Sequence, residues 1–170
     1  LTGSNASFAP GAKLPVPLTK NAYEDSVRIR NAAAPDMAGL QQPTLDGFTP
    51  DETAQNEITD CFRYGWTAKK TGDAITFLVE GSCIAVQYRK SVKLPAPVAL
   101  AVVDDDTEHA VRLDANFDET WGDKLELATL LEHGKEGRHI VTIRLAETHE
   151  DDAVPFYLVS VIATGRRGRD

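Results

Sequence analysis

The sequence is poor in cysteine and has no long apolar run. Its two cysteines, Cys61 and Cys83, form no Cys-x-x-Cys pair among 170 residues. A chain of this length needs no disulfide scaffold, and two thiols alone do not make a zinc site. We therefore expect two free, largely buried cysteines. The longest nearly apolar run, Leu94 to Val103, contains two prolines and is too short to span a bilayer.

Positive charge is also scarce. The chain has 18 Lys and Arg against 26 Asp and Glu, a net charge of −8 at pH 7. Such a surface repels nucleic acid and anionic membranes, so we expect neither as a partner. The N-terminus lacks the basic and apolar regions of a signal peptide. Because the first residue is Leu1 and not Met, we expect a piece of a longer protein. The composition fits a bacterial protein that is either cytoplasmic or secreted.

The usual catalytic patterns are missing as well. There is no Gly-x-Ser-x-Gly, and the turn Gly81-Ser82-Cys83 has no helix start beside it that would activate a thiol. The four histidines lack metal-ligand spacing. The acidic runs 104–106 and 150–152 fit solvated turns better than calcium loops. We predict no catalytic residue, no metal and no cofactor in this chain.

What the sequence does have is a series of short apolar segments separated by turns. Apolar residues make up 42% of the chain. Alternation with a period of two, or continuous apolar character, is typical of β-strands. About seven such strands are predicted: Ala74–Glu80, Cys83–Arg89, Val98–Asp104, Glu108–Leu113, Leu125–Leu131 (which also fits a helix), Arg138–Leu145 and Phe156–Ala163. His139 lies on the apolar face of its segment, so we expect a buried, hydrogen-bonded histidine.

The N-terminal third is different, because it is rich in Pro, Gly, Ala and Asn and has little periodicity. We predict a linker over residues 1–20 and a flexible tail over 165–170. Asn21–Ile29 fits a strand or a short helix, and Thr49-Pro50-Asp51-Glu52 has the pattern of a helix start. No long helices alternate with the strands, so the predicted fold is all-β. It is an antiparallel β-sandwich or jelly roll over 21–164 with an irregular N-terminal segment.

Aromatic residues provide the one candidate ligand site. Flat rings stack on sugars while carboxylates and amides bind hydroxyls. Trp66 and Trp121 each neighbour a glycine and are predicted at strand ends, where they either bind sugar or cap the core. The full set of rings and polar partners considered is Tyr64, Trp66, Tyr88, Trp121, Asp118, Asp123 and Arg89. From these, the candidate ligand contacts are Trp66, Tyr88, Trp121, Asp123 and Arg89.

Several segments, taken in order, resemble the β-sandwich accessory domain of bacterial SGNH/GDSL-type hydrolases, a group of esterases and lipase-like proteins. The resemblance covers residues 21 to 164. One departure is the pair Asp105-Asp106, where such domains often have Asp-Gly. The segments are Asn21-Ala22-Tyr23-Glu24-Asp25, Phe62-Arg63-Tyr64-Gly65-Trp66, Gly72-Asp73-Ala74-Ile75-Thr76-Phe77, Tyr88-Arg89-Lys90-Ser91, Asp114-Ala115-Asn116-Phe117, Trp121-Gly122-Asp123, Gly137-Arg138-His139-Ile140-Val141-Thr142-Ile143 and Phe156-Tyr157-Leu158.

The resemblance implies a non-catalytic domain. The nucleophile motif of that family is Gly-Asp-Ser, whereas here Gly72-Asp73 is followed by Ala74. The implied partner is a hydrolase domain of the same polypeptide, on which this domain docks while it contacts carbohydrate. Some carbohydrate esterases instead place a jelly roll before the hydrolase domain. Two alternatives stay open: a free-standing carbohydrate-binding module, and an unfamiliar hydrolase that uses Ser82 or Cys83. A purely structural or protein-interaction role would be marked by an exposed apolar patch.

Overall fold

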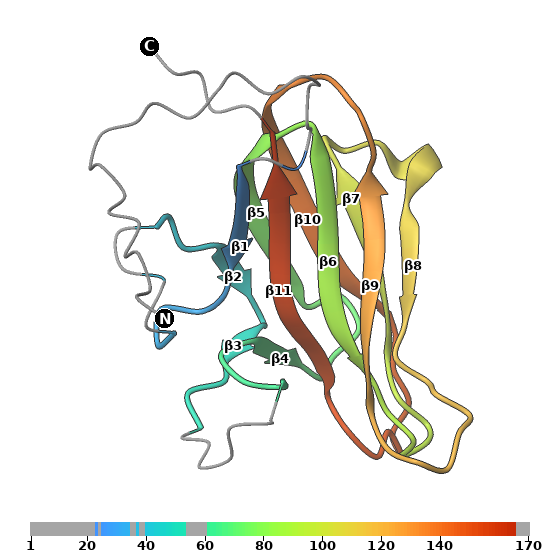
Figure 1. Ribbon diagram of the computed structural model, residues 1–170. Helices are drawn as coiled ribbons and strands as arrows, with labels where there is room; N and C mark the ends of the chain where they lie inside the picture. The colour runs from blue at the N-terminus through green and yellow to red at the C-terminus, as the bar shows by residue number, and fades with distance from the viewer. Residues whose placement is uncertain (1–22, 24, 35–36, 38–39, 54–60, 166–170) are drawn as a thin grey trace, which may run out of the picture.

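The chain folds into two antiparallel sheets packed face to face, as predicted. The computed structural model describes residues 23, 25–34, 37, 40–53 and 61–165 (Figure 1). The predicted linker over 1–20 and all but the first residue of the predicted tail over 165–170 lie outside this part of the chain. Within it, no helix is long and apolar enough to cross a membrane.

Eleven strands are found in the described residues. One six-stranded sheet, here the front sheet, has the order β3-β4-β11-β6-β9, with β1 also paired to β11. The five-stranded back sheet has the order β2-β5-β10-β7-β8. The bounds are β1 Ser26–Ile29, β2 Thr44–Asp46, β3 Thr49–Pro50, β4 Trp66–Ala68, β5 Ala74–Gly81, β6 Cys83–Lys90, β7 Val98–Val103, β8 Val111–Asp114, β9 Lys124–Leu131, β10 Gly137–Glu147 and β11 Phe156–Thr164.

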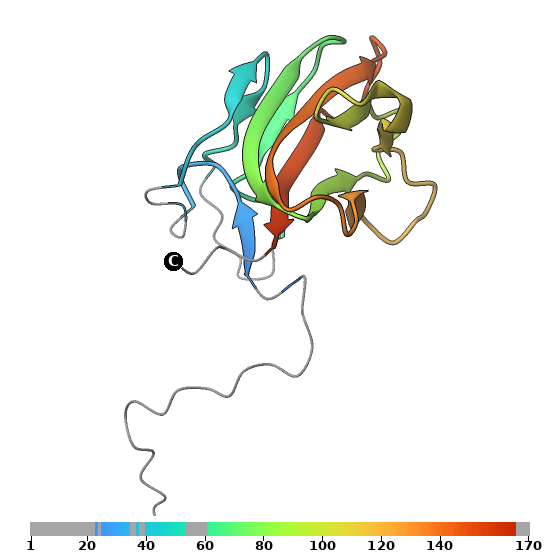
Figure 2. The same cartoon turned by 90° about the horizontal axis from the view of Figure 1, so that it is seen from above.

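Most connections between consecutive strands cross from one sheet to the other, which gives the two layers seen from above in Figure 2. The turn after Gly81, which the sequence suggests as a hairpin, joins β5 in the back sheet to β6 in the front sheet. A Cβ atom on Gly81 would lie 2.5 Å from the carbonyl oxygen of Thr164. Glycine is therefore required where this crossing passes close to the end of β11.

The core lies between the two sheets and follows the predicted alternation. In β10, the inward residues His139, Val141, Ile143 and Leu145 are buried. Strand β11 is buried at eight of its nine positions, because β6, β4 and β1 flank it. Trp66 packs edge to face on Phe77 with ring centroids 5.3 Å apart. This interdigitation of inner faces is what a β-sandwich requires for a single core.

His139 is the buried, hydrogen-bonded histidine that the sequence predicts. Its Nδ1 lies 2.6 Å from the carboxylate of Asp104 and its Nε2 lies 2.8 Å from the carbonyl oxygen of Lys135. Both partners are acceptors, an arrangement that favours the doubly protonated, charged form of the ring. Burial opposes this charge, but the two hydrogen bonds outweigh it and raise the pKa of His139. The same contact lowers the pKa of Asp104.

Two local predictions need correction, and one alternative that the sequence leaves open is decided. Thr49-Pro50 is not a helix start but strand β3, paired with β4 at the sheet edge, where the missing N–H of proline is tolerated. The strand predicted from Glu108 begins only at Val111, because Asp106 caps a 3₁₀ turn, η2 (Thr107–His109), by accepting from the His109 N–H. The ambiguous segment at 125–131 is a strand, since β9 pairs with β6 along its length.

Neither cysteine forms a disulfide, as predicted. Cys83 is buried, but Cys61 is exposed, which corrects the expectation that both thiols are largely buried. Cys61 precedes β4 in a segment without regular structure, so no strand carries it into the core.

Candidate functional site

Three loops meet at one end of the sandwich, the lower end in Figure 1, and we call them the loop end: residues 91–97, 115–123 and 148–155. Backbone hydrogen bonds tie them together. The N–H of Ala153 donates to the carbonyl of Pro95 at 2.8 Å, and the N–H of Phe117 donates to that of Ser91 at 3.0 Å. Loops held by a rigid sheet scaffold in this way are common places for binding sites.

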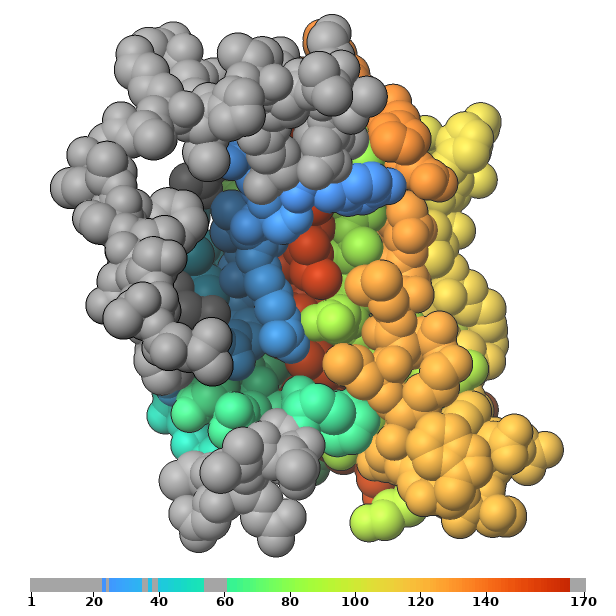
Figure 3. All heavy atoms as spheres, viewed as in Figure 1, coloured from blue at the N-terminus to red at the C-terminus, as the bar shows by residue number. Residues whose placement is uncertain are grey.

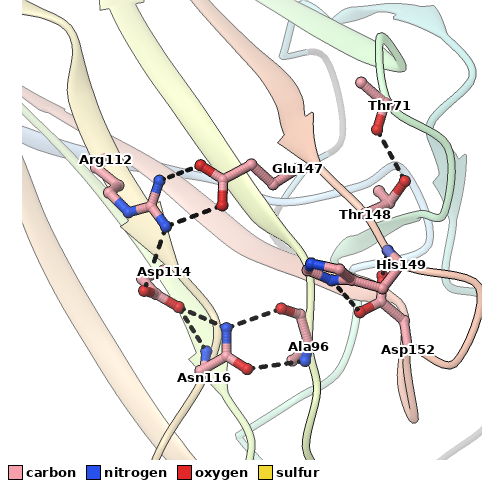
Figure 4. A network of polar contacts seen from close by, with 9 residues as sticks. All are labelled: Thr71, Ala96, Arg112, Asp114, Asn116, Glu147, Thr148, His149 and Asp152. Atoms are coloured by element: carbon pink, nitrogen blue, oxygen red, sulfur yellow. Dashed lines mark hydrogen bonds and ion pairs between the residues drawn. The ribbon is translucent and has the colours of Figure 1, made fainter.

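Asn116 fixes the first two loops to each other (Figure 4). Its Nδ2 donates to the carbonyl of Ala96 at 2.8 Å, and its Oδ1 accepts from the Ala96 N–H at 2.9 Å. Asp114, at the end of β8, accepts from both the backbone and the side-chain nitrogen of Asn116. The side chain of Asn116 is therefore fully used in holding the loops.

Asp123 and Arg89, two of the predicted ligand contacts, are brought together at the base of the loop end. The Asp123 carboxylate accepts from the Ser91 hydroxyl at 2.8 Å and from the Val92 N–H at 3.1 Å, and lies 3.8 Å from Arg89 Nε. Arg89 also donates to the carbonyl of Pro155 at 3.3 Å. Both side chains link loops, so their observed bonds are internal to the protein, and a ligand contact by either stays a prediction.

Trp121 is the exposed aromatic residue of the loop end, with 68% of its surface accessible. It stands edge to face on Phe117 at 5.3 Å between ring centroids. The Phe117 ring also has the ammonium groups of Lys90 and Lys124 over it, at 5.9 and 5.8 Å. The indole of Trp121 thus contacts one phenyl ring, and most of its surface is open to solvent.

Beside these loops lies a polar cleft of about 270 Å³, lined among others by Lys69, Pro97, His149, Glu150 and Asp152. His149 and Asp152 shape its rim, since the Asp152 carboxylate accepts from the His149 N–H at 2.9 Å (Figure 4). Near it, the hydroxyls of Thr71 and Thr148 lie 2.8 Å apart. Charged and hydroxyl groups around a concave surface are suited to binding a polyol.

The structure removes two of the predicted ligand contacts from the surface. Trp66 is 1% exposed and Tyr88 is 4% exposed. Tyr88 stacks on Phe156 at 6.0 Å, and burial, with Glu126 and Asp114 nearby, raises the pKa of Tyr88 to about 12. Both rings point into the core from their strands, so in this structure neither offers a face to a ligand.

Sequence reasoning missed Phe117, His149, Asp152 and Lys69 as members of this end of the molecule. The first carried a usable signal, because it is an aromatic residue four positions before Trp121. The others come from the β4–β5 and β10–β11 connections, which the fold brings close to the cleft.

A second concavity lies on the outer face of the front sheet. It is an apolar groove of about 320 Å³ between β1 and β9, visible in Figure 3 as a hollow over β6 and β11. Cys83 lines it, and His133 Nδ1 lies 4.0 Å from the Cys83 sulfur. No carboxylate hydrogen-bonds to His133 among the described residues, so the acid that an oriented nucleophile–histidine pair needs is not in place.

The described residues also contain no group of three or more side chains arranged to hold a metal ion. Asp104, the first residue of the acidic run 104–106, instead accepts from His139 and from the Ile140 N–H. Asp152, in the run 150–152, is used by His149.

Comparison with protein-family models finds no match, and comparison with curated proteins finds none either. Solved structures do match. A two-domain esterase active on acetylated mannans, crystallised with mannopentaose, is 60% identical, with a TM-score of 0.81 over 93% of this chain. This chain spans 41% of the length of that esterase.

Two more distant structures show the fold. A family two carbohydrate esterase from Cellvibrio japonicus is 18% identical with a TM-score of 0.54, over 84% of this chain and 34% of its own. A β-1,3-glucan-binding module of family 6 from Bacillus halodurans is 12% identical with a TM-score of 0.50, over 86% of this chain and 98% of its own. The predicted resemblance is confirmed: this chain corresponds to the non-catalytic β-sandwich domain of a two-domain esterase.

Proposed function

We propose that this chain is the accessory domain of an SGNH-type carbohydrate esterase and that its loop end contacts the acetylated polysaccharide, with mannan as the substrate class. The identity of 60% with an esterase active on acetylated mannans carries the proposal. The role expected here is to hold the sugar chain while a hydrolase domain of the same polypeptide removes the acyl groups.

The loop end has the chemistry for this role. Trp121 offers an open indole face, and an aromatic ring with one apolar face suits stacking on a pyranose. The cleft beside loops 91–97 and 148–155 carries an ammonium group from Lys69, the His149 ring and the Glu150 carboxylate. These groups can donate to and accept from sugar hydroxyls, as ligand sites of this type require.

The number of open rings favours a single sugar chain as the ligand. The ammonium groups of two lysines lie over the Phe117 ring, and the rings of Trp66 and Tyr88 are buried in the core. One open indole at the loop end fits one sugar unit of a soluble chain, whereas a crystalline polysaccharide surface would need several coplanar rings. We therefore expect weak binding of soluble oligosaccharides.

The test is a calorimetric titration of the isolated chain with acetylated mannopentaose. Trp121→Ala should weaken binding by at least about tenfold, which is the loss of roughly 1.4 kcal/mol. Tyr23→Ala is the matched control, because Tyr23 is 52% exposed but lies near His133 at the opposite end of the sandwich. Equal binding by both variants and the unchanged chain would refute the role of the loop end.

An ester-hydrolysis assay on the same samples separates the rivals. We expect p-nitrophenyl acetate to be hydrolysed at the background rate by the chain and equally by its Ser82→Ala and Cys83→Ala variants. Activity that disappears in either variant would support the hydrolase hypothesis instead. Sugar binding that leaves the activity of a fused hydrolase domain unchanged would favour a free-standing binding module.

A further inference from the structure

The outer face of the back sheet carries an uncharged patch in its middle. Leu78 on β5 pairs directly with Ile140 on β10, and these side chains are 43% and 45% exposed. Leu100 on β7 is 37% exposed. The patch, which we call the aliphatic face, consists of Leu78, Ile140, Thr76, Thr142, Val102 and Leu100. Leu100 lies at its edge, since its register partners are Arg144 and Arg112. Three large aliphatic side chains are thus exposed on one sheet face.

A rim of charges surrounds the aliphatic face. The pair Glu80 and Arg138 follows Leu78 and Ile140 in the register at one end. At the other end Arg144 lies beside Leu100, and Arg112 binds Glu147. Uncharged residues bordered by charged ones are a common feature of protein–protein contacts.

The chemistry of this face does not fit a sugar. None of its six residues is aromatic, so there is no ring for a pyranose to stack on. A pleated sheet face with leucine, isoleucine and valine exposed instead suits another apolar protein surface. Several exposed aliphatic residues on one sheet face are typical of interaction sites in soluble proteins.

We infer that the aliphatic face is where the hydrolase domain of the same polypeptide docks. This rests on the proposed function. In the 60%-identical esterase, this chain accounts for only 41% of the length, so a second domain of greater size is joined to it. Contacts between domains of one chain are modest in area, about 600–1,500 Å². A tether of that kind supplies an effective concentration of about 1 mM, so a small face is enough.

A second copy of the chain fits this face less well. A stable dimer between separate molecules buries about 800 Å² on each partner. Three exposed aliphatic residues with three threonine and valine neighbours fall short of such a core.

Thiol labelling tests the inference. In a Cys61→Ser background, Leu78→Cys is introduced into the 170-residue chain and into a fusion in which this chain replaces the matching domain of the 60%-identical esterase. Maleimide labelling is followed by intact mass. With an effective concentration of about 1 mM and an interface Kd of about 0.1 mM, the face is covered about nine-tenths of the time, so labelling slows about tenfold.

Leu127→Cys is the matched control. Leu127 is 55% exposed on β9, on the outer face of the opposite sheet, and should label at the same rate in both proteins. Equal rates for Leu78→Cys in chain and fusion would overturn the inference. Slow labelling of Leu78→Cys in the isolated chain, together with a dimer mass by light scattering, would show that a second copy covers the face. That result would also overturn the inference. The sugar titration of the isolated chain tests only the loop end, whereas the labelling tests only the aliphatic face. A failure of one proposal is therefore distinguishable from a failure of the other.

Discussion

The two tryptophans offer a direct test of how the structure assigns the same residue type to two tasks. Trp66 is 1% exposed on β4, whereas Trp121 is 68% exposed at the loop end. We expect Trp66→Ala to reduce the free energy of unfolding strongly and Trp121→Ala to reduce it much less. Ligand binding should respond in the reverse order.

The magnitudes follow from the buried areas. A buried tryptophan removes about 150–250 Å² from water, which at about 25 cal/mol per Å² is about 4–6 kcal/mol. Core Trp→Ala substitutions cost about 3–5 kcal/mol, and Trp66 also loses its edge contact with Phe77. Trp121 buries about a third as much, so its loss should cost at most about 1–2 kcal/mol.

The assay is guanidinium and thermal unfolding followed by far-ultraviolet circular dichroism, which reports mainly on the backbone. At this chain length each kcal/mol moves the thermal midpoint by about 2–4 °C, so Trp66→Ala should melt about 6–20 °C lower. Trp66→Phe serves as the control, since it refills part of the volume and should recover part of the loss. A loss of less than about 1 kcal/mol in the free energy of unfolding for Trp66→Ala would refute the buried position of Trp66. A loss for Trp121→Ala that exceeds the loss for Trp66→Ala would refute it too.

Three further predictions concern the fold. Asn31 is 1% exposed and donates to two backbone carbonyls at 2.8 and 2.7 Å; Asn31→Ala should cost about 2–4 kcal/mol in urea unfolding, because those acceptors lose their donor. The raised pKa of His139 means that its contribution to stability is complete below about pH 6.5 and is lost as pH rises through the raised value. The lowered pKa of Asp104 means that the contribution of its carboxylate to stability is lost only in acid. The difference in free energy of unfolding between the unchanged chain and His139→Gln should therefore be largest between the pKa of Asp104 and that of His139, and should shrink above neutrality. A difference that does not change with pH would contradict this prediction. Ellman's reagent should titrate Cys61 quickly in the native chain and Cys83 only after unfolding.

Much of the sandwich was predictable because its longer strands keep a strict period of two. The strand from 138 to 145 was predicted with His139, Val141 and Ile143 inward, and they are inward. The apolar strand near the C-terminus is buried on both faces, as its sequence suggests. The pairing was not predictable. Strands β5 and β6 are neighbours in sequence yet lie in different sheets, and β11 pairs with β1 from the far end of the chain.

The N-terminal third was harder to predict for a physical reason. Its strands have two to four residues, too few to show a period, and they exist because longer strands pair with them. At Pro50, local helix-start chemistry predicted a helix, but pairing of β3 with β4 determined the outcome. Asn31 shows the same dependence, since the carbonyls that it satisfies lie 20 and 34 residues away.

The candidate site shows why a residue list from sequence mixes ligand contacts with supports. Trp121, Asp123 and Arg89 were chosen for their chemistry alone, but chemistry does not tell whether a polar group is already bonded. Asp123 accepts two hydrogen bonds from loop 91–97, and Arg89 reaches loop 148–155, contacts that span 31 to 66 residues. Only the fold reveals that these two side chains hold the loops around the indole. If so, replacing Asp123 should weaken sugar binding by displacing Trp121, and the loss should vanish in a Trp121→Ala background, because the two substitutions then act through one contact.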